Sequence, residues 1–320
     1  MTGSSPDIVA LNPGNHGIPI EVLREAVAER LPGYNVATAY TPDQKRQLLS
    51  TARFAVGINL ESEYIPHATA VELFASTYAG TGHIPLDELA SAGIAVTNAS
   101  GVHGPNIGEY VLGAILLFIR RFDEATRRQR RNEWRHFQAD ELMGKTVTII
   151  GLGAIGTAIV ERLEGFGVRT IGVRYSSEKG GPTDEVIGFD PGPLHEALSR
   201  TDVLVLACPL TETTRGLIAH NELVTLPPDA LLVNIARGPV IDTDDLVTIL
   251  QDNQLGGAVL DVTDPEPLPA DHPLWGFENV RITPHNAGHT PQYFARVADI
   301  LTENVIRIER GEAELVNQVV

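Results

Sequence analysis

Residues 146–156 read TVTIIGLGAIG, and this stretch decides the fold. Five strand-forming residues run directly into a G-x-G-x-x-G loop, and a helical pattern follows over residues 155–165. The first glycine permits a tight turn, the second lets the backbone approach a pyrophosphate, and the third lets helix and strand pack closely. The helix N-terminus would offer unpaired N–H groups to phosphates, so the motif predicts a dinucleotide site. The residues predicted to contact the cofactor here are Gly151, Gly153, Ala154, Ile155 and Gly156.

On both sides of this motif, short apolar runs alternate with amphipathic segments. Such alternation predicts parallel sheets covered on both faces by helices. The pattern pauses at Ala99–Pro105, which separates two α/β series. The predicted strands are Ile8–Leu11, Val36–Tyr40, Phe54–Ile58, Leu73–Thr77, Thr146–Ile150, Thr170–Val173, Val203–Ala207, Leu231–Ile235, Gly257–Leu260 and Val280–Thr283. The predicted long helices are Ile20–Arg30, Thr41–Ala52, Ile107–Asn132, Ile155–Gly165 and Tyr293–Arg310.

The predicted fold class is therefore α/β, with two Rossmann-like, doubly wound parallel-sheet domains separated by a cleft. A length of 320 residues is consistent with two domains. The hydrophobic fraction of 43% and the charged fraction of 20% are those of a globular protein. The last helix could pack on either domain, and the sequence pattern leaves that choice open.

The charge balance is strongly acidic, with 24 Lys and Arg against 41 Asp and Glu and a net charge of −17. Such a surface repels phosphate backbones and anionic lipids, so neither nucleic acid nor a membrane is an expected partner. Only three basic residues are lysines, namely Lys45, Lys145 and Lys179. Many carboxylates with few lysines suit a salt-rich cytosol that screens self-repulsion. We therefore expect a halophilic source, the alternative being an acidic mesophilic protein.

Several features of the sequence predict that the protein is cytoplasmic. Cys208 is the single cysteine, so an intrachain disulfide is impossible and a reducing compartment is expected. The N-terminus lacks a basic region followed by an apolar core, so no secretory signal is expected. The longest apolar run, near residues 110–119, is too short to span a bilayer. No Cys and His residues have zinc-ligand spacing, so no catalytic metal is expected.

The end of the second strand after the glycine loop predicts which dinucleotide is bound. An acidic residue there would bind the ribose hydroxyls of NAD, whereas an arginine accommodates the 2′-phosphate of NADP. Strand 170–173 is followed by Arg174, Tyr175, Ser176 and Ser177, with no acidic residue. A guanidinium can hold a phosphate through two parallel hydrogen bonds. We therefore expect NADP(H) to be preferred, with NAD(H) used more weakly, unless Arg174 is merely a surface residue.

Three later strands each lead into a polar residue that could do chemistry. Arg237 follows strand 231–235, Glu266 follows strand 257–260, and His285 follows strand 280–283. Because ligands bind at the carboxyl ends of the strands in open α/β sheets, these side chains could converge on the nicotinamide. Arg237 would bind a carboxylate and polarise a carbonyl. His285 would donate a proton, oriented by Glu266.

At these motifs the chain resembles the D-isomer-specific, NAD(P)-dependent 2-hydroxyacid dehydrogenases over nearly its whole length. The matching stretches are Gly144–Gly156, Cys208–Thr211 with Thr214, Asn234–Asp242, Asp261 with Pro265–Pro267, and Thr283–His285. The resemblance implies reduction of a 2-oxo acid, with Arg237, Glu266 and His285 catalytic. Further residues that it places at the cofactor are Cys208, Pro209, Thr214, Ala236 and Asp261. The substrate-binding set that it implies is Ala79, Gly80, Thr81, Gly82, Arg237 and His285.

The resemblance also implies how the chain is divided. A discontinuous substrate-binding domain would comprise residues 1–100 and 288–320, and the coenzyme domain would comprise residues 101–287. A homodimer formed through the coenzyme domain is implied as well. Many members carry an acidic residue at the position of Arg174, and the departure here resembles the NADPH-preferring members.

Two other functions fit the same fold. A formate dehydrogenase would have no alcohol proton to transfer, so the predicted pairing of Glu266 with His285 argues against it. A non-catalytic dinucleotide sensor is disfavoured by the intact set of Arg237, Glu266 and His285 and would be distinguished by an activity assay. The seven arginines between Arg120 and Arg135 could bind a polyanion, but the net charge favours a solvated or interface-forming helix.

Overall fold

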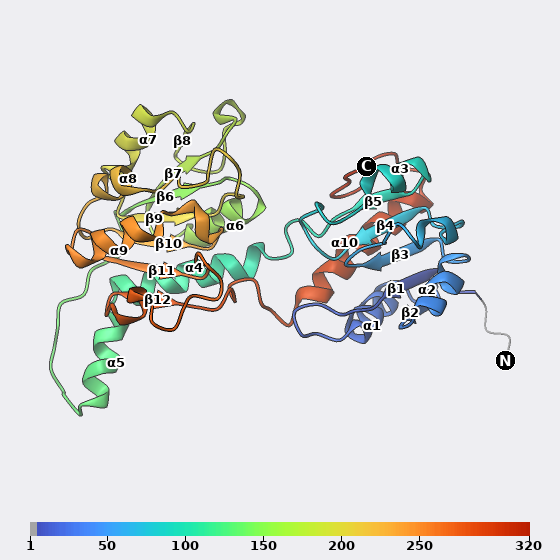
Figure 1. Cartoon of the computed structure of the whole chain (residues 1–320), viewed down its shortest axis with the longest axis horizontal. Coiled ribbons are helices and arrows are strands. Elements are labelled where there is room, and N and C mark those ends of the chain that lie inside the picture. The colour runs from blue at the N-terminus through green and yellow to red at the C-terminus, as the bar shows by residue number, and fades with distance from the viewer. Residues whose placement is uncertain (1–4) are drawn as a thin grey trace. The chain divides into compact units, whose positions relative to one another are not determined.

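The computed structural model describes residues 5–320 and divides into two units. The first unit comprises residues 5–102 together with His289–Val320, and the second comprises His103–Gly288. Each unit is built on its own parallel sheet with helices on both faces (Figure 1). This arrangement confirms the predicted class of two doubly wound, Rossmann-like α/β domains.

In the first unit, five parallel strands pair in the order β2-β1-β3-β4-β5. The strands are β1 (Ile8–Leu11), β2 (Val36–Ala39), β3 (Phe54–Gly57), β4 (Leu73–Ser76) and β5 (Ala95–Thr97). The helices are α1 (Ile20–Arg30), α2 (Pro42–Leu49), α3 (Leu86–Ser91) and α10 (Tyr293–Glu309). Side chains of α1 and α10 pack in one hydrophobic cluster on the sheet, so the C-terminal helix belongs to this unit. Strands β1, β3 and β4 are buried at every position, as parallel strands covered on both faces must be.

In the second unit, seven parallel strands pair in the order β12-β11-β10-β9-β6-β7-β8. The strands are β6 (Thr146–Ile150), β7 (Arg169–Val173), β8 (Glu185–Ile187), β9 (Val203–Leu206), β10 (Leu231–Asn234), β11 (Gly257–Leu260) and β12 (Val280–Ile282). The helices are α4 (Gly104–Ile119), α5 (Phe122–Arg130), α6 (Ala154–Leu163), α7 (Pro191–Leu198), α8 (His220–Thr225) and α9 (Thr243–Gln251). Two hydrophobic clusters, one on each face, bury the sheet.

The predicted single helix over residues 107–132 is wrong. Helix α4 ends at Ile119, and α5 starts at Phe122 with a different direction (Figure 1). Arg121 between them has a φ of 51°, a left-handed conformation that a right-handed helix cannot continue through. Helix α5 and the irregular segment that follows it, residues 131–141, have few buried side chains, and Trp134 is 96% exposed. We call residues 122–141 the arm.

Two short strands were missed by the sequence analysis. Both β5 and β8 have three residues and lie at the edges of their sheets, and the outer side of β5 is hydrogen-bonded to Val319 and Val320 near the C-terminus. Too few residues lie in them for a distinct apolar run, and β8 is only partly buried. The other predicted strands are confirmed, with ends that shift by at most one residue. No helix in the described part of the chain is long and apolar enough to cross a membrane.

Candidate active site

The glycine loop between β6 and α6 is shaped by close backbone contacts. Gly151 has a φ of 105°, and a Cβ atom there would lie 2.7 Å from the backbone of Cys208. A Cβ on Gly156 would lie 1.9 Å from the carbonyl oxygen of Gly151. Any side chain at either position would therefore push β6, β9 and α6 apart. The loop leaves the first N–H groups of the ten-residue helix α6 facing the carboxyl edge of the sheet, where an anion would bind.

A pocket of about 430 Å³ lies beside this loop and collects many of the predicted cofactor residues. The residues that were predicted to bind the cofactor and that line this pocket are Gly151, Gly153, Arg174, Tyr175, Ser176, Cys208, Pro209 and Thr214. Ala154, Ile155 and Gly156 form the start of α6, and Ser177 begins a short 3-10 helix. Phe189 and Thr213 also line the pocket and were not predicted. Phe189 follows strand β8, which the sequence pattern did not reveal.

Among residues 5–320, Arg174 is the only charged residue that lines this pocket. It follows β7 directly, and its Nη1 donates to the carbonyl oxygen of Gly180 at 2.8 Å. This bond orients the guanidinium while leaving its other N–H groups able to bind an anion. No carboxylate competes for the position that would bind a ribose hydroxyl. The pocket therefore offers a cationic side chain, at the end of β7, to an anionic group of a ligand.

Glu266 and His285 meet at the carboxyl edge of the same sheet. The Nδ1 of His285 lies 3.1 Å from the Oε2 of Glu266, and both side chains are partly exposed. The N–H of Thr263 donates to the other oxygen of Glu266 at 3.2 Å. Because an ionised carboxylate can only accept, Nδ1 carries the proton in this pair. The Nε2 of His285 is then left to exchange a proton with a substrate.

Arg237 lies on the neighbouring strand end, after β10, and is exposed. The loop that carries Arg237 is stabilised by the side chain of Asn234, which is 1% exposed. Asn234 accepts from the N–H of Ala236 at 3.0 Å and donates to the carbonyl oxygen of Arg237 at 3.1 Å. The guanidinium of Arg237 donates to the carbonyl oxygen of Ala236 at 2.6 Å. The sheet thus places the third predicted catalytic residue on the same edge as the Glu266–His285 pair.

Asp261, predicted at the cofactor, is 3% exposed. Its Oδ1 accepts from the hydroxyl of Thr283 at 2.6 Å and from the N–H of Asn286 at 2.7 Å. Its Oδ2 accepts from the N–H of Ala287 at 2.9 Å. The carboxylate is therefore occupied by the segment that carries His285.

In the first unit, the predicted substrate loop follows β4. Ala79, Gly80 and Gly82 are exposed and Thr81 is half-buried. The structure gives the backbone N–H groups of residues 79–83 no acceptor among residues 5–320, whereas the carbonyl oxygen of Ala79 accepts from the Asn98 amide at 2.7 Å. A run of N–H groups without acceptors is suited to binding an anion such as a carboxylate.

A buried network holds the start of this loop. Asn15, which is 7% exposed, donates to the Tyr293 hydroxyl at 2.8 Å and accepts from the Tyr78 hydroxyl at 3.0 Å. The Tyr293 hydroxyl in turn donates to the carbonyl oxygen of Thr77. Burial raises the pKa of Tyr293 to about 12, so its hydroxyl keeps its proton. The loop is thus fixed by two side chains from distant parts of the sequence.

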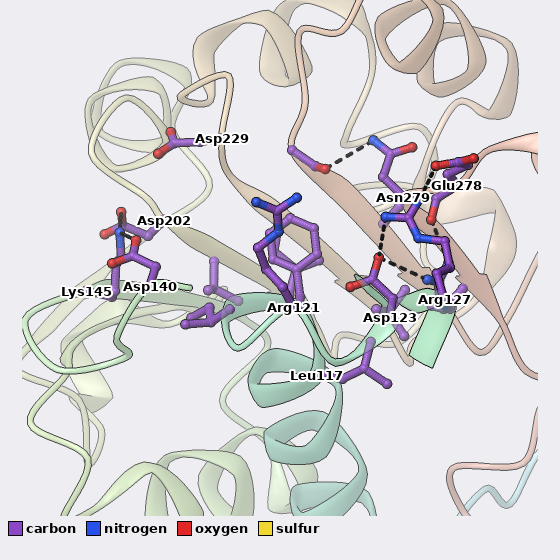
Figure 2. A pocket seen from close by; sticks show the side chains of 18 residues that line it. Leu117, Arg121, Asp123, Arg127, Asp140, Lys145, Asp202, Asp229, Glu278 and Asn279 are labelled. Atoms are coloured by element: carbon purple, nitrogen blue, oxygen red, sulfur yellow. Dashed lines mark hydrogen bonds and ion pairs between the residues drawn. The ribbon is translucent and has the colours of Figure 1, made fainter. Parts of the chain in front are cut away.

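A second cavity, of about 390 Å³, lies at the amino ends of the strands (Figure 2). It is bounded by the end of α4, the start of α5 and the first residues of β9, β10 and β11. The charged side chains that line it are Arg121, Asp123, Arg127, Asp140, Lys145, Asp202, Asp229, Glu278 and Arg281. Several of them form ion pairs, including Lys145 with Asp140 at 2.6 Å and Arg281 with Asp123 at 3.4 Å. This cavity lies away from the glycine loop and the Glu266–His285 pair, and the sequence pattern did not indicate it.

The chain is similar to proteins of known family. Residues 112–287 match the family model described as D-isomer specific 2-hydroxyacid dehydrogenase, NAD binding domain. A glyoxylate reductase of Thermofilum pendens is 34% identical over 260 residues, which cover 79% of this chain and 76% of the relative. A glyoxylate/hydroxypyruvate reductase A of Arabidopsis thaliana is 33% identical over 282 residues, covering 85% and 88%.

Solved structures agree in fold with the whole chain. A D-isomer specific 2-hydroxyacid dehydrogenase family protein of Aeromonas salmonicida superimposes with a TM-score of 0.76 at 31% identity, covering 99% of each chain. A D-isomer specific 2-hydroxyacid dehydrogenase of Xanthobacter autotrophicus, solved with NADPH and MES, has a TM-score of 0.76 at 26% identity. That match covers 99% of this chain and 98% of the other.

Cys208 illustrates how burial decides reactivity at this pocket. Burial raises the pKa of its thiol to about 11, so the nucleophilic thiolate is scarce at neutral pH. We expect iodoacetamide at pH 8 to alkylate the folded protein on the order of 100-fold more slowly than a free cysteine. The control is the same chain unfolded in guanidinium chloride, measured by mass spectrometry. Equal rates in the folded and unfolded chain would contradict the structural role of this thiol.

Proposed function

The chain belongs to the D-isomer specific 2-hydroxyacid dehydrogenase family, and on that premise we propose that it reduces a 2-oxo acid to the D-2-hydroxy acid with NADPH. The observation that carries the proposal is the contact of His285 with Glu266 at the carboxyl edge of the sheet that also holds the glycine loop. In the balanced reaction, a 2-oxo acid, NADPH and a proton give a 2-hydroxy acid and NADP⁺. The second unit would be the coenzyme domain and the first the substrate domain.

The residues present fit a dinucleotide. Gly151 and Gly156 leave no space for side chains under the loop, and the start of α6 presents free N–H groups. When bound, the dinucleotide supplies the hydride that reduces the carbonyl carbon. Arg237 would bind the substrate carboxylate and polarise the carbonyl. In the first unit, the N–H groups of residues 79–83, which have no acceptor among residues 5–320, would bind an anionic group.

His285 would protonate the oxygen that forms on the substrate. Glu266 keeps the ring oriented through its contact with Nδ1, which leaves Nε2 to face the substrate. Reduction consumes this proton, so its rate should decline at alkaline pH, while oxidation of the hydroxy acid should gain. Closure of the site against water would keep the hydride from being lost to solvent.

The proposed substrates are short 2-oxo acids. The relatives named glyoxylate reductase and hydroxypyruvate reductase make these two acids the first to test. We also propose that the protein works in the cytoplasm of a salt-adapted cell, because its net charge is −17 and very few of its basic residues are lysines. Rates should accordingly be measured in both low and high KCl.

The decisive experiment follows NADPH and NADH oxidation at 340 nm with 2-oxo acids from glyoxylate to six-carbon chains. We expect NADPH-dependent turnover in the wild type and a loss of about 10²–10⁴ in kcat for His285→Ala, the usual range for a general acid. His67→Ala, an exposed histidine of the first unit, is the control and should keep wild-type rates. Silence across the whole panel with NADPH still bound would instead favour a dinucleotide sensor.

The preference for NADP(H) is proposed to depend on Arg174. Support comes from its position in the pocket and from the NADPH in the Xanthobacter relative. Arg174→Asp removes the charge-assisted hydrogen bonds to the 2′-phosphate, so it should weaken NADPH binding by about 10- to 100-fold. The variant should therefore favour NADH. Arg310→Asp, in the first unit, is the matched control. An unchanged ratio of the two kcat/KM values in Arg174→Asp would refute the assignment.

We further propose a homodimer in which the arm of one copy docks on the coenzyme domain of another. The arm projects from the second unit and is rich in arginine, with Trp134 96% exposed (Figure 1). The cavity in Figure 2 offers an apolar floor, with Asp202 and Asp229 at its edge. The apolar floor suits an aromatic anchor, and the carboxylate of Asp229 at its edge suits an arginine of the arm, although the basic residues Arg121, Arg127, Lys145 and Arg281 also line the cavity.

Trp134→Ala tests the arm directly. We expect it to weaken the dimer by at least 10-fold in dissociation constant, because exposed aromatic anchors dominate such interfaces. Trp275→Ala, a tryptophan 52% exposed outside the arm, should leave the oligomer unchanged. Light scattering during size-exclusion chromatography measures both. A monomeric wild type would remove the proposal.

A further inference from the structure

His285 has an unfavourable backbone conformation that other contacts must stabilise. Its φ is 53°, a left-handed conformation that residues other than glycine adopt rarely and at a free-energy cost. This conformation turns the imidazole toward Glu266. Without contacts that hold the segment, the chain would relax to a more favourable φ and move the ring.

The support comes from Asp261, on the adjacent strand end. Its backbone carbonyl oxygen accepts from the N–H of His285 at 2.8 Å. Its carboxylate accepts from the hydroxyl of Thr283 and from the N–H groups of Asn286 and Ala287, at 2.6, 2.7 and 2.9 Å. Residues on both sides of His285 are therefore tied to one buried carboxylate, whose desolvation is offset by these three donors.

Helix α4 extends this support from the other side. The hydroxyl of Tyr110 lies 2.6 Å from the hydroxyl of Thr283. Thr283 has a single hydroxyl proton, which it donates to Asp261, so Tyr110 must be the donor to Thr283. One turn earlier, the side-chain amide of Asn106 donates to the carbonyl oxygen of Ala287 at 2.8 Å. The helix thus contacts both ends of the segment that carries His285.

We propose that Tyr110 is a positioning residue for His285, acting through Thr283 and Asp261. The inference rests on the proposed function, because it concerns the same histidine. Within the described part of the chain, the Tyr110 hydroxyl bonds to Thr283 and the ring of His285 bonds to Glu266, so Tyr110 acts on the pair through other residues. Its hydroxyl fixes the rotamer of Thr283, the Thr283 hydroxyl fixes one oxygen of Asp261, and Asp261 holds the left-handed backbone. Burial raises the pKa of Tyr110, so the hydroxyl remains a donor across the working pH range.

The test compares Tyr110→Phe and Thr283→Val with the wild type in the full-length protein. Each substitution removes one hydrogen bond from the series that joins Tyr110, Thr283 and Asp261, and should lower kcat for reduction by about 2- to 10-fold. The KM for NADPH should stay unchanged, and the pH profile of kcat should change in the same sense as it does in Glu266→Gln. The control is Tyr64→Phe, which changes a buried tyrosine of the first unit and should alter neither quantity.

A double-mutant cycle separates positioning from general destabilisation. If Tyr110 acts through the orientation of His285 toward Glu266, then Tyr110→Phe should cost much less in a Glu266→Gln background. Equal losses in both backgrounds, or a wild-type kcat and pH profile in Tyr110→Phe, would overturn the proposal.

The imidazole signals of His285, followed by NMR titration and identified with His285→Gln, provide a readout that needs no activity. A shifted titration in Tyr110→Phe supports positioning even if the wild type reduces no 2-oxo acid, in which case only the proposed function fails. An unshifted titration together with an inactive wild type overturns both.

Discussion

Parallel pairing of the strands in the second unit is the constraint on which the candidate site depends. All seven strands run in the same direction, so the residues that follow them emerge along one edge of the sheet. The glycine loop, Arg174, Arg237 and the Glu266–His285 pair are all found there. Residues more than a hundred positions apart in the chain thereby share one surface, while the helices on both faces bury the rest of the sheet.

Beneath the exposed reactive side chains lie buried polar ones that hold them. Asn234 is 1% exposed and supports the loop of Arg237, and Asp261 is 3% exposed and supports that of His285. A buried amide or carboxylate is stable only when its hydrogen-bonding capacity is used. Asn234 bonds to neighbouring backbone, and Asp261 accepts from two backbone N–H groups and from the hydroxyl of Thr283. The reactive residues can therefore remain accessible to a substrate while their backbones stay fixed.

The first unit also has a buried polar side chain that fixes an exposed loop. Asn15, 7% exposed, joins the loop after β1 to Tyr78 and Tyr293, so that side chains from both ends of the sequence fix the loop of residues 79–82. The N–H groups of that loop have no acceptors among the described residues. Each unit thus combines a rigid buried polar layer with an exposed layer suited to a charged ligand.

The sequence alone determined ten of the twelve strands in the described part of the chain. It also determined the glycine loop, the arginine in place of an acidic residue at position 174 and the three polar residues after the later strands. These features follow from local signals: apolar runs, glycines and the first residue beyond each run. Tertiary structure decided the break at Arg121, the packing of α10 on the first unit and Phe189 in the cofactor pocket. It also decided the hydrogen-bond chain from Tyr110 through Thr283 to Asp261. Those contacts join residues far apart in the chain, and no local periodicity encodes which distant partner a side chain will meet.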